Sequence, residues 1–310
     1  MPLTLAKLVH GLLLAAALSC VGVGPAALAA EKQKTFSSPE DAAKALGAAS
    51  RAGDVKALEN ILGPGSASLI RSGDSVADRR GRERFAQAYE EASKVERQGD
   101  AKAILLIGKD EWPMPIPIVK GKDGWRFDAK QGREEVLNRR VGRNELSAVQ
   151  AMLAYVDAQR EYYLRNPRGD KLLHYAQKFD STRGKRDGLY FPTKAGEAPS
   201  PLGPLFAKAK AAGYSKDEDG LPDPYFGYRY RILKAQGPDA PGGAYDYVVQ
   251  GRMIGGFALI AWPASYGNSG VMTFIVNHDG VVYEKNLGPG TATAVGKITR
   301  FNPDKTWKRH

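Results

Sequence analysis

Cysteine and histidine are scarce in this sequence, which limits the chemistry available to the chain. The sequence has one cysteine and four histidines, and Cys20 and His10 both lie within the range 1–30. Without that range the chain has no cysteine, which excludes disulfides, a thiol nucleophile and thiolate metal ligands. The remaining His174, His278 and His310 are scattered and lack the ligand spacing of a zinc site. We therefore expect no resident metal and no other cofactor.

Long apolar stretches are also missing beyond the N-terminus. The single apolar run is Gly11–Val23. It is too short to cross a bilayer, since a crossing needs about 20 residues. The small residues Ala27–Ala30 follow it and precede Glu31, which is the pattern that signal peptidase cleaves. The range 1–30 is therefore predicted to be a secretory signal peptide. The mature chain is expected in the periplasm or outside the cell, without a transmembrane anchor.

One alternative for the N-terminus stays open. Leu18-Ser19-Cys20 is similar to a lipoprotein processing site, in which the cysteine is acylated and retained. Ala17 stands where that motif usually has a branched aliphatic residue. Lipidation at Cys20 is thus the alternative to ordinary cleavage.

The charge balance favours anionic partners. Removal of the range 1–30 takes away only Lys7, so the 45 Lys and Arg become 44 against 34 Asp and Glu, a net charge of +10. An exported basic protein tends to lie near phosphate-bearing polymers or lipid head groups of the envelope. The basic residues are interleaved with acids and form no stripe with exposed aromatics, so nucleic acid is not expected as a partner. We expect an envelope protein or a glycan.

The N-terminal part of the mature chain has several predicted helices followed by strands. Helices are predicted at 38–53, 55–61 and 78–98, and strands at 103–107 and 125–128, with an outward-facing proline edge strand at 112–118. This order resembles the cone-shaped fold of nuclear-transport-factor-2-like (NTF2-like) and cystatin-like proteins over the range 38–130. We assign the range 31–140 to this first α+β domain, since the mature chain exceeds the usual single-domain length of about 100–150 residues.

The C-terminal part has a long helix and an antiparallel sheet. The range 131–164 has a helical apolar face with a possible break at Gly142, and a loop-rich segment with a short helix at 205–212 follows. Strands are predicted at 226–232, 245–249, 258–262, 272–277 and 281–284. The range 141–310 would then form a second α+β domain. It is similar to the globular heads of type IV pilin-like and pseudopilin proteins, although the chain lacks their prepilin motif and long apolar N-terminal helix.

Several longer strings resemble one exported bacterial family. They are Ser38-Pro39-Glu40-Asp41-Ala42, Trp112-Pro113-Met114-Pro115-Ile116-Pro117, Gly142-Arg143-Asn144-Glu145-Leu146 and Gly184-Lys185-Arg186-Asp187-Gly188-Leu189-Tyr190. With them, the whole mature chain resembles the family known as domain of unknown function 2950. That resemblance implies no reaction, so no catalytic residue is transferred to this chain.

A group of aromatic and basic residues in the C-terminal part is the candidate binding face. Part of the group is expected in the sheet core, and neighbouring glycine-rich loops leave the remainder to bind a glycan or peptide. The candidate residues are Tyr228, Arg229, Tyr230, Arg231, Tyr245, Tyr247, Trp262 and Tyr266.

Two other motifs have simpler interpretations. Gly267–Gly270, with Ser269, is similar to a serine-protease nucleophile loop, for which His174 and Asp180 are conceivable partners, but a turn between strands explains its glycines better. The acidic loop 217–223 fails as an EF-hand, because Phe226 occupies the position of the bidentate glutamate, which leaves a looser calcium site or a solvated loop.

No catalytic residue is nominated by these patterns. The sequence favours a non-catalytic envelope binding or assembly module over an enzyme. A periplasmic hydrolase acting on an envelope polymer is the alternative.

Overall fold

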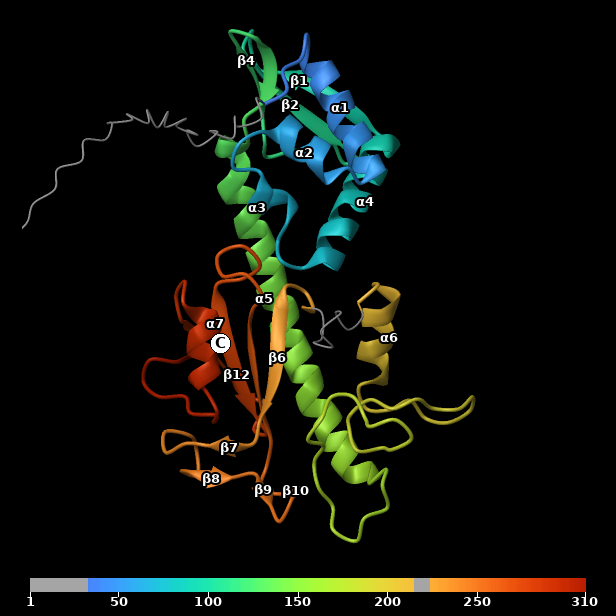
Figure 1. The fold of residues 1–310 in the computed structure, drawn as a ribbon, viewed down its shortest axis with the longest axis vertical. Coiled ribbons are helices and arrows are strands. Elements are labelled where there is room, and N and C mark those ends of the chain that lie inside the picture. Colours follow the sequence, from blue (N-terminus) through green and yellow to red (C-terminus); the bar gives the residue numbers. More distant parts are fainter. Residues whose placement is uncertain (1–32, 215–223) are drawn as a thin grey trace, which may run out of the picture. The chain divides into compact units, whose positions relative to one another are not determined.

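The computed structural model describes residues 33–214 and 224–310, which form an α+β fold (Figure 1). The predicted fold class is therefore confirmed. The predicted signal peptide and the acidic loop at 217–223 lie outside the described residues. None of the helices in the described ranges combines the length and apolar character that a membrane crossing needs.

Short helices open the described chain, and their ends follow local sequence signals. Ser38 caps the first helix by accepting a hydrogen bond from the Asp41 N–H, and Pro39 occupies the first turn. Gly53 ends this helix with a φ of 65°. Glycine adopts that left-handed conformation without strain. The helices are α1 (Pro39–Ala52), α2 (Val55–Leu62), α3 (Ala67–Ile70) and α4 (Ser75–Glu91).

An antiparallel sheet packs with these helices and corrects two predictions. Its strands are β1 (Ser93–Arg97), β2 (Lys102–Ile107), β3 (Trp112–Pro113), β4 (Ile118–Gly121) and β5 (Gly124–Phe127). The helix predicted to reach residue 98 ends at Glu91, because the next residues pair with β2 as β1. The single edge strand predicted at 112–118 is also wrong. Only Trp112 and Pro113 of that segment pair with β2 as β3, and Pro117 is buried rather than facing outward.

A single long helix, α5 (Ala129–Arg165), follows the first sheet. The predicted break at Gly142 is absent from this helix. A side chain at Gly142 would meet nothing within 4 Å, so the helix passes it without a packing constraint. Gly132 differs, because a Cβ there would lie 2.5 Å from the Pro115 carbonyl oxygen.

The second sheet has the strand order β14-β13-β12-β11-β6 and is antiparallel throughout. Met152, Tyr155 and Val156 of α5 are buried in the core that this sheet shares. The predicted strand 245–249 does not join the sheet but forms two short strands with other partners. The strands are β6 (Tyr228–Leu233), β7 (Ala235–Gln236), β8 (Tyr245–Asp246), β9 (Val248–Val249), β10 (Arg252–Met253), β11 (Ala258–Pro263), β12 (Met272–Asn277), β13 (Val282–Asn286) and β14 (Lys308–Arg309).

Two helices accompany this part of the chain. The helix α6 (Gly203–Ala211) begins slightly before the predicted 205–212, and α7 (Thr291–Lys297) was not predicted. Two hydrophobic clusters form the cores, one of residues between 42 and 129 and one of residues between 148 and 301. The predicted domain boundary at 140/141 falls inside α5, and the division into two domains stays a prediction.

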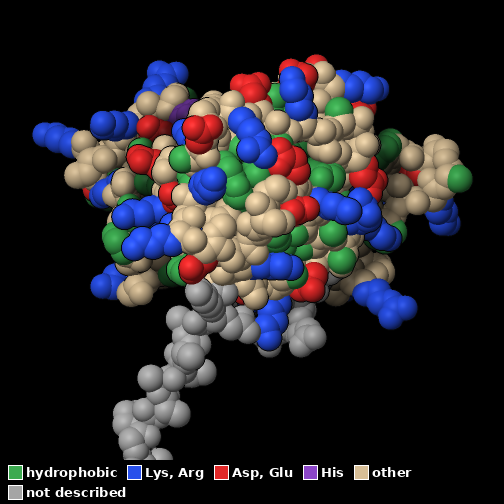
Figure 2. Space-filling view, turned by 90° about the horizontal axis from the view of Figure 1, so that it is seen from above, with side chains coloured by type: hydrophobic (Ala, Val, Ile, Leu, Met, Phe, Trp, Pro, Cys, Tyr) green, Lys and Arg blue, Asp and Glu red, His purple; other side chains and the backbone are tan. Residues whose placement is uncertain are grey.

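The surface carries interleaved charges of both signs. In the face drawn in Figure 2, Lys and Arg side chains alternate with Asp and Glu side chains, without one continuous basic area. A local excess of positive charge therefore has to be sought in individual clefts.

Candidate functional site

Two residues of the predicted binding face are in the protein core. Tyr228 and Tyr247 are both fully buried. The Tyr228 hydroxyl donates to the Met272 carbonyl oxygen at 2.9 Å, and the Tyr247 hydroxyl donates to the Gln236 side-chain oxygen at 2.9 Å. Both side chains therefore stabilise the fold and present no surface to a partner.

The arginines of β6 differ in how they are held. The Arg231 guanidinium donates to the carbonyl oxygens of Val295 and Ile298, each at 2.7 Å, and lies 5.6 Å from the ring centroid of Trp262. These contacts tie β6 and β11 to α7. Arg229 is half-buried beside Trp262 in the strand register. Arg231 and Trp262 thus have internal partners.

The remaining tyrosines are half-buried and lie on different elements. Tyr230 on β6 donates to the Tyr225 carbonyl oxygen at 3.4 Å, and Tyr266, in the loop after β11, donates to the Asn286 side-chain oxygen at 3.0 Å. Tyr245 of β8 packs edge-on against the buried Tyr247, with ring centroids 5.6 Å apart. The structure does not gather the eight candidate residues into one exposed face.

The glycine-rich loop 267–270 is a structural turn. Ser269 is fully buried, and its hydroxyl accepts from the Ser265 N–H at 2.9 Å and donates to the Ser265 carbonyl at 3.1 Å. Asn268 accepts from the Arg140 guanidinium at 2.6 Å and donates to the Arg71 carbonyl at 2.8 Å. No hydrogen bond in the described ranges joins a serine hydroxyl to a histidine. The loop therefore attaches the second sheet to α5 and to the segment after α3.

A polar cleft of about 480 Å³ lies on the segment that follows α5, and the sequence had not indicated it as a site. Arg168, His174, Lys178 and Asp187 come from this segment, Lys234 from between β6 and β7, and Arg252 from β10. Of these, the sequence analysis had named His174, for a different chemistry, and Asp187, only as part of a string shared with a family. Their spacing along the chain is irregular, so no local motif could have indicated the site.

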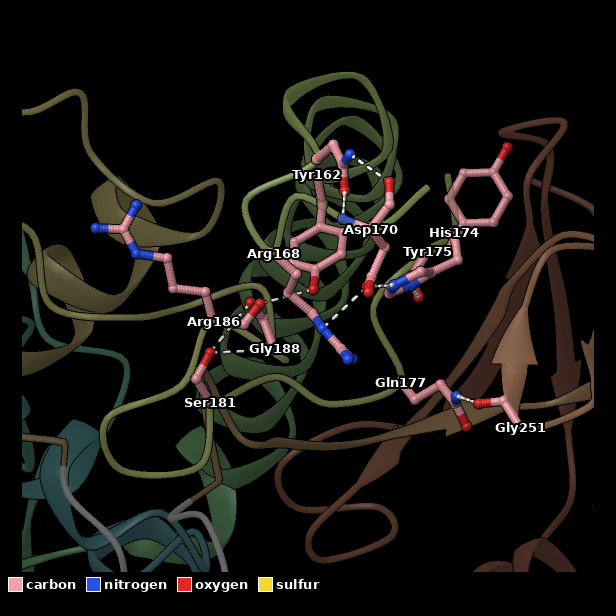
Figure 3. Close-up of polar contacts among 11 residues, drawn as sticks. Tyr162, Arg168, Asp170, His174, Tyr175, Gln177, Ser181, Arg186, Gly188 and Gly251 are labelled. Atoms are coloured by element: carbon pink, nitrogen blue, oxygen red, sulfur yellow. Dashed lines mark hydrogen bonds and ion pairs between the residues drawn. The ribbon is translucent and has the colours of Figure 1, made fainter. Parts of the chain in front are cut away.

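The end of α5 positions the first wall of the cleft. Asn166 ends the helix with a φ of 45°, and its side chain forms hydrogen bonds with both the N–H and the carbonyl oxygen of Asp170. Asparagine tolerates this left-handed conformation better than most residues. The resulting turn brings Asp170 beside Arg168, with 3.0 Å between the Arg168 Nε and the Asp170 carboxylate (Figure 3).

His174 is a positioning residue inside this wall. Its Nε2 lies 2.7 Å from the Asp170 carboxylate, and its Nδ1 lies 3.0 Å from the Tyr175 carbonyl oxygen (Figure 3). Both ring nitrogens therefore lie against acceptor oxygens of neighbouring residues, and in the described part of the chain neither lies against a side-chain nucleophile. The hydrogen bond from His174, and after it the charge of Arg168, holds the pKa of Asp170 below its ordinary value. This geometry suits a rigid binding wall better than general-base catalysis.

Two hydrogen bonds to backbone carbonyls join the two walls of the cleft. The Tyr175 N–H donates to the Met253 carbonyl oxygen at 2.8 Å. The Gln177 side chain donates to the Gly251 carbonyl oxygen at 2.8 Å, as Figure 3 shows. These bonds fix the segment after α5 against the β9–β10 hairpin. Arg252 of that hairpin thereby joins His174 in lining the cleft.

Asp187 is the one carboxylate among the cleft-lining residues, and its charge is compensated. It accepts from the Lys178 ammonium at 2.8 Å, the Thr182 N–H at 2.7 Å and the Thr182 hydroxyl at 2.9 Å. Desolvation raises the pKa of Asp187, but the hydrogen bonds from Lys178 and Thr182 outweigh it and leave the pKa well below its usual range. Asp187 is therefore ionised and neutralised within the protein.

The cleft keeps an excess of positive charge after these pairings. Arg168 is paired with Asp170, and Lys178 with Asp187. Lys234 and Arg252 have exposed side chains with no ion pair among the described residues. With both pairs set aside, Lys234 and Arg252 leave two positive charges without a paired carboxylate among the described residues at the cleft, an arrangement that attracts anions. Within residues 33–214 and 224–310, no group of three His, Cys, Asp or Glu side chains is placed to hold a metal ion.

Comparison with known proteins identifies a family. The model of the family described as "Protein of unknown function (DUF2950)" matches residues 33–310. No curated protein and no solved structure matches the chain. The NTF2-like and pilin-like resemblances of its two parts stay predictions.

Proposed function

We propose, from the premise that this chain belongs to the DUF2950 family of proteins of unknown function, that it is an exported envelope protein that binds an anionic partner. The partner would occupy the cleft between the segment after α5 and the β9–β10 hairpin. This replaces the aromatic face considered from the sequence with a basic cleft, and it retains a binding or assembly role.

The observation that carries the proposal is the pair of unpaired cations, Lys234 and Arg252. Both side chains are exposed and line a cleft in which Asp187 is already neutralised by Lys178. An arginine fork binds phosphate or carboxylate with two parallel hydrogen bonds, and a lysine adds a compact charge. The cleft therefore has donors and charge directed at an anion.

Composition agrees with this proposal. The predicted export of the chain would bring it to the cell envelope, where phosphate-bearing polymers and lipid head groups supply anions. The net positive charge of the mature chain favours its accumulation near such polymers. The contacts of both His174 nitrogens with Asp170 and with the Tyr175 carbonyl oxygen hold this residue in the wall of the cleft, which agrees with a binding role.

The experiment is calorimetric titration of the protein with tripolyphosphate at low and at physiological ionic strength. We expect saturable binding that weakens as salt is added, because exposed charges are screened. The double substitution Lys234→Glu and Arg252→Glu should weaken binding by about tenfold or more, a loss of at least about 1.4 kcal/mol.

A charge-matched control separates a site from general attraction. Lys208→Glu and Lys210→Glu make the same change in net charge on the exposed side of α6, outside the cleft lining. This variant should bind nearly as tightly as the unmodified protein. Equal losses in both variants, or no binding of the probe by the unmodified protein, would refute the proposal.

A further inference from the structure

A second cleft of about 480 Å³ adjoins the first and shares two of its residues. Arg168 and Asp187 line both clefts, and Lys185 and Arg186 line only the second. The second cleft is formed by the turn after α5 and by the loop between Thr182 and Asp187. The two clefts are therefore neighbours along one strip of surface.

The second cleft also has an excess of positive charge. Lys185 is exposed and has no ion pair in the described part of the chain, while Arg186 pairs with Glu197. The turn that presents Lys185 is closed by its N–H, which donates to the Thr182 carbonyl oxygen at 2.8 Å. Gly184 in this turn has a φ of 77°, a conformation that glycine adopts readily. The local backbone thus holds the Lys185 ammonium group at the rim of the second cleft.

Arg168 can act on both sides of the boundary between the clefts. Its Nε is used by Asp170, but its two Nη groups make no hydrogen bond to the described residues. A guanidinium has five N–H donors in a planar fork, so four remain available. The other shared residue, Asp187, is neutralised by Lys178 and so opposes an anion only weakly.

We infer that the ligand is a linear polyanion with repeated phosphate groups, which occupies both clefts and passes Arg168. One anionic group would lie between Lys234 and Arg252, and another beside Lys185. This inference rests on the proposed function of the first cleft. It adds that the affinity depends on the length of the ligand. When two anionic groups of one molecule bind two weak sites at once, the overall affinity rises without any new kind of contact.

The test compares inorganic phosphate, tripolyphosphate and a longer linear polyphosphate as probes. We expect the dissociation constant, expressed per ligand molecule and not per phosphate group, to be about 100-fold or more lower for the longer polyphosphate than for inorganic phosphate. Lys185→Glu should remove most of this gain and leave the affinity for inorganic phosphate nearly unchanged. Arg183→Glu is the control, since Arg183 is exposed in the same turn but lines neither cleft.

The outcomes distinguish this inference from the proposal beneath it. Equal affinity for short and long probes, or equal losses in the Lys185 and Arg183 variants, would overturn the two-cleft ligand and leave single-anion binding intact. Failure of every probe to bind would overturn both. Oligogalacturonate, a linear chain with carboxylate groups in place of phosphates, serves as a further probe. If it binds as tightly as polyphosphate, the assignment of the ligand as a phosphate polymer is wrong. Unchanged urea midpoints verify that both variants fold.

Discussion

Asp74 offers the sharpest test of how the parts of this fold are joined. It caps α4, with one carboxylate oxygen accepting from the Ala77 N–H at 2.8 Å. The other oxygen accepts from the Gly227 N–H at 2.8 Å and from the Tyr214 hydroxyl at 2.9 Å. The residue is almost completely buried, with 1% of its surface exposed. Asp74→Ala therefore removes a helix cap and leaves two donors without a partner.

The size of the effect follows from these contacts. Loss of an N-cap costs about 1 kcal/mol, and a buried donor without a partner costs about 1–3 kcal/mol. We expect Asp74→Ala to lower the free energy of unfolding by about 2–4 kcal/mol, from the cap and the buried Gly227 N–H, with a smaller addition from the half-buried Tyr214 hydroxyl. Equilibrium urea denaturation, followed by tryptophan fluorescence and circular dichroism, measures this change.

Asp54 provides a matched control for the same substitution. It caps α2 by accepting from the Ala57 N–H at 2.9 Å, but its side chain is exposed and has no other hydrogen bond in the described ranges. Asp54→Ala should cost about 1 kcal/mol, the value of the cap alone. If the two variants lose equal stability, then Asp74 does not join α4 to Tyr214 and Gly227.

Other changes test the helix and the cleft. Gly142→Ala should raise the free energy of unfolding by about 0.5–1 kcal/mol, because its site in α5 is open. Gly132→Ala in the same helix should lower it, since the new Cβ would meet the Pro115 carbonyl, and a gain there in thermal or urea stability would contradict the packing. Asp187→Asn should destabilise the protein at neutral pH, with the difference from the unmodified protein shrinking below about pH 4. The lowered pKa of Asp187 means that its contribution is present above the unfolded-state pKa and is lost as it protonates in acid. Urea midpoints at neutral and acidic pH measure this, and a constant difference would refute it.

Local sequence signals predicted the positions of helices well, but they did not predict a helix end that depends on the pairing of distant strands. The Ser38 cap at the start of α1 and the left-handed Gly53 at its end are each local signals that involve only a few residues. The first helix was therefore predicted nearly to its ends. The end of α4 depends on β1 pairing with β2, a contact that no local pattern contains. Gly142 shows the reverse case. Glycine is a weak helix former, but α5 continues because packing on both sides of that position stabilises the helix.

The candidate sites show the same division between local and distant information. Tyrosine and arginine alternate along β6. This sequence pattern is the same whether the tyrosines face the protein core or a bound ligand, so the sequence alone cannot distinguish the two cases. Burial of Tyr228 and Tyr247 was decided by α5 and the other strands of the sheet. The basic cleft could not be predicted, because Arg168, Lys234 and Arg252 belong to segments with no shared motif.

The sequence by itself determined the α+β class, most helix positions and the antiparallel strands 258–262 and 272–277. These follow from periodicity, caps and turns, which act over a few residues. Only the tertiary structure decided which polar side chains meet. The bonds of Tyr175 to Met253 and of Gln177 to Gly251 bring Arg252 into the same cleft as His174, and the pairing of Lys178 with Asp187 leaves that cleft positive. Such an excess of charge depends on distances in space, because electrostatic attraction acts between neighbours in the fold and not between neighbours in the chain.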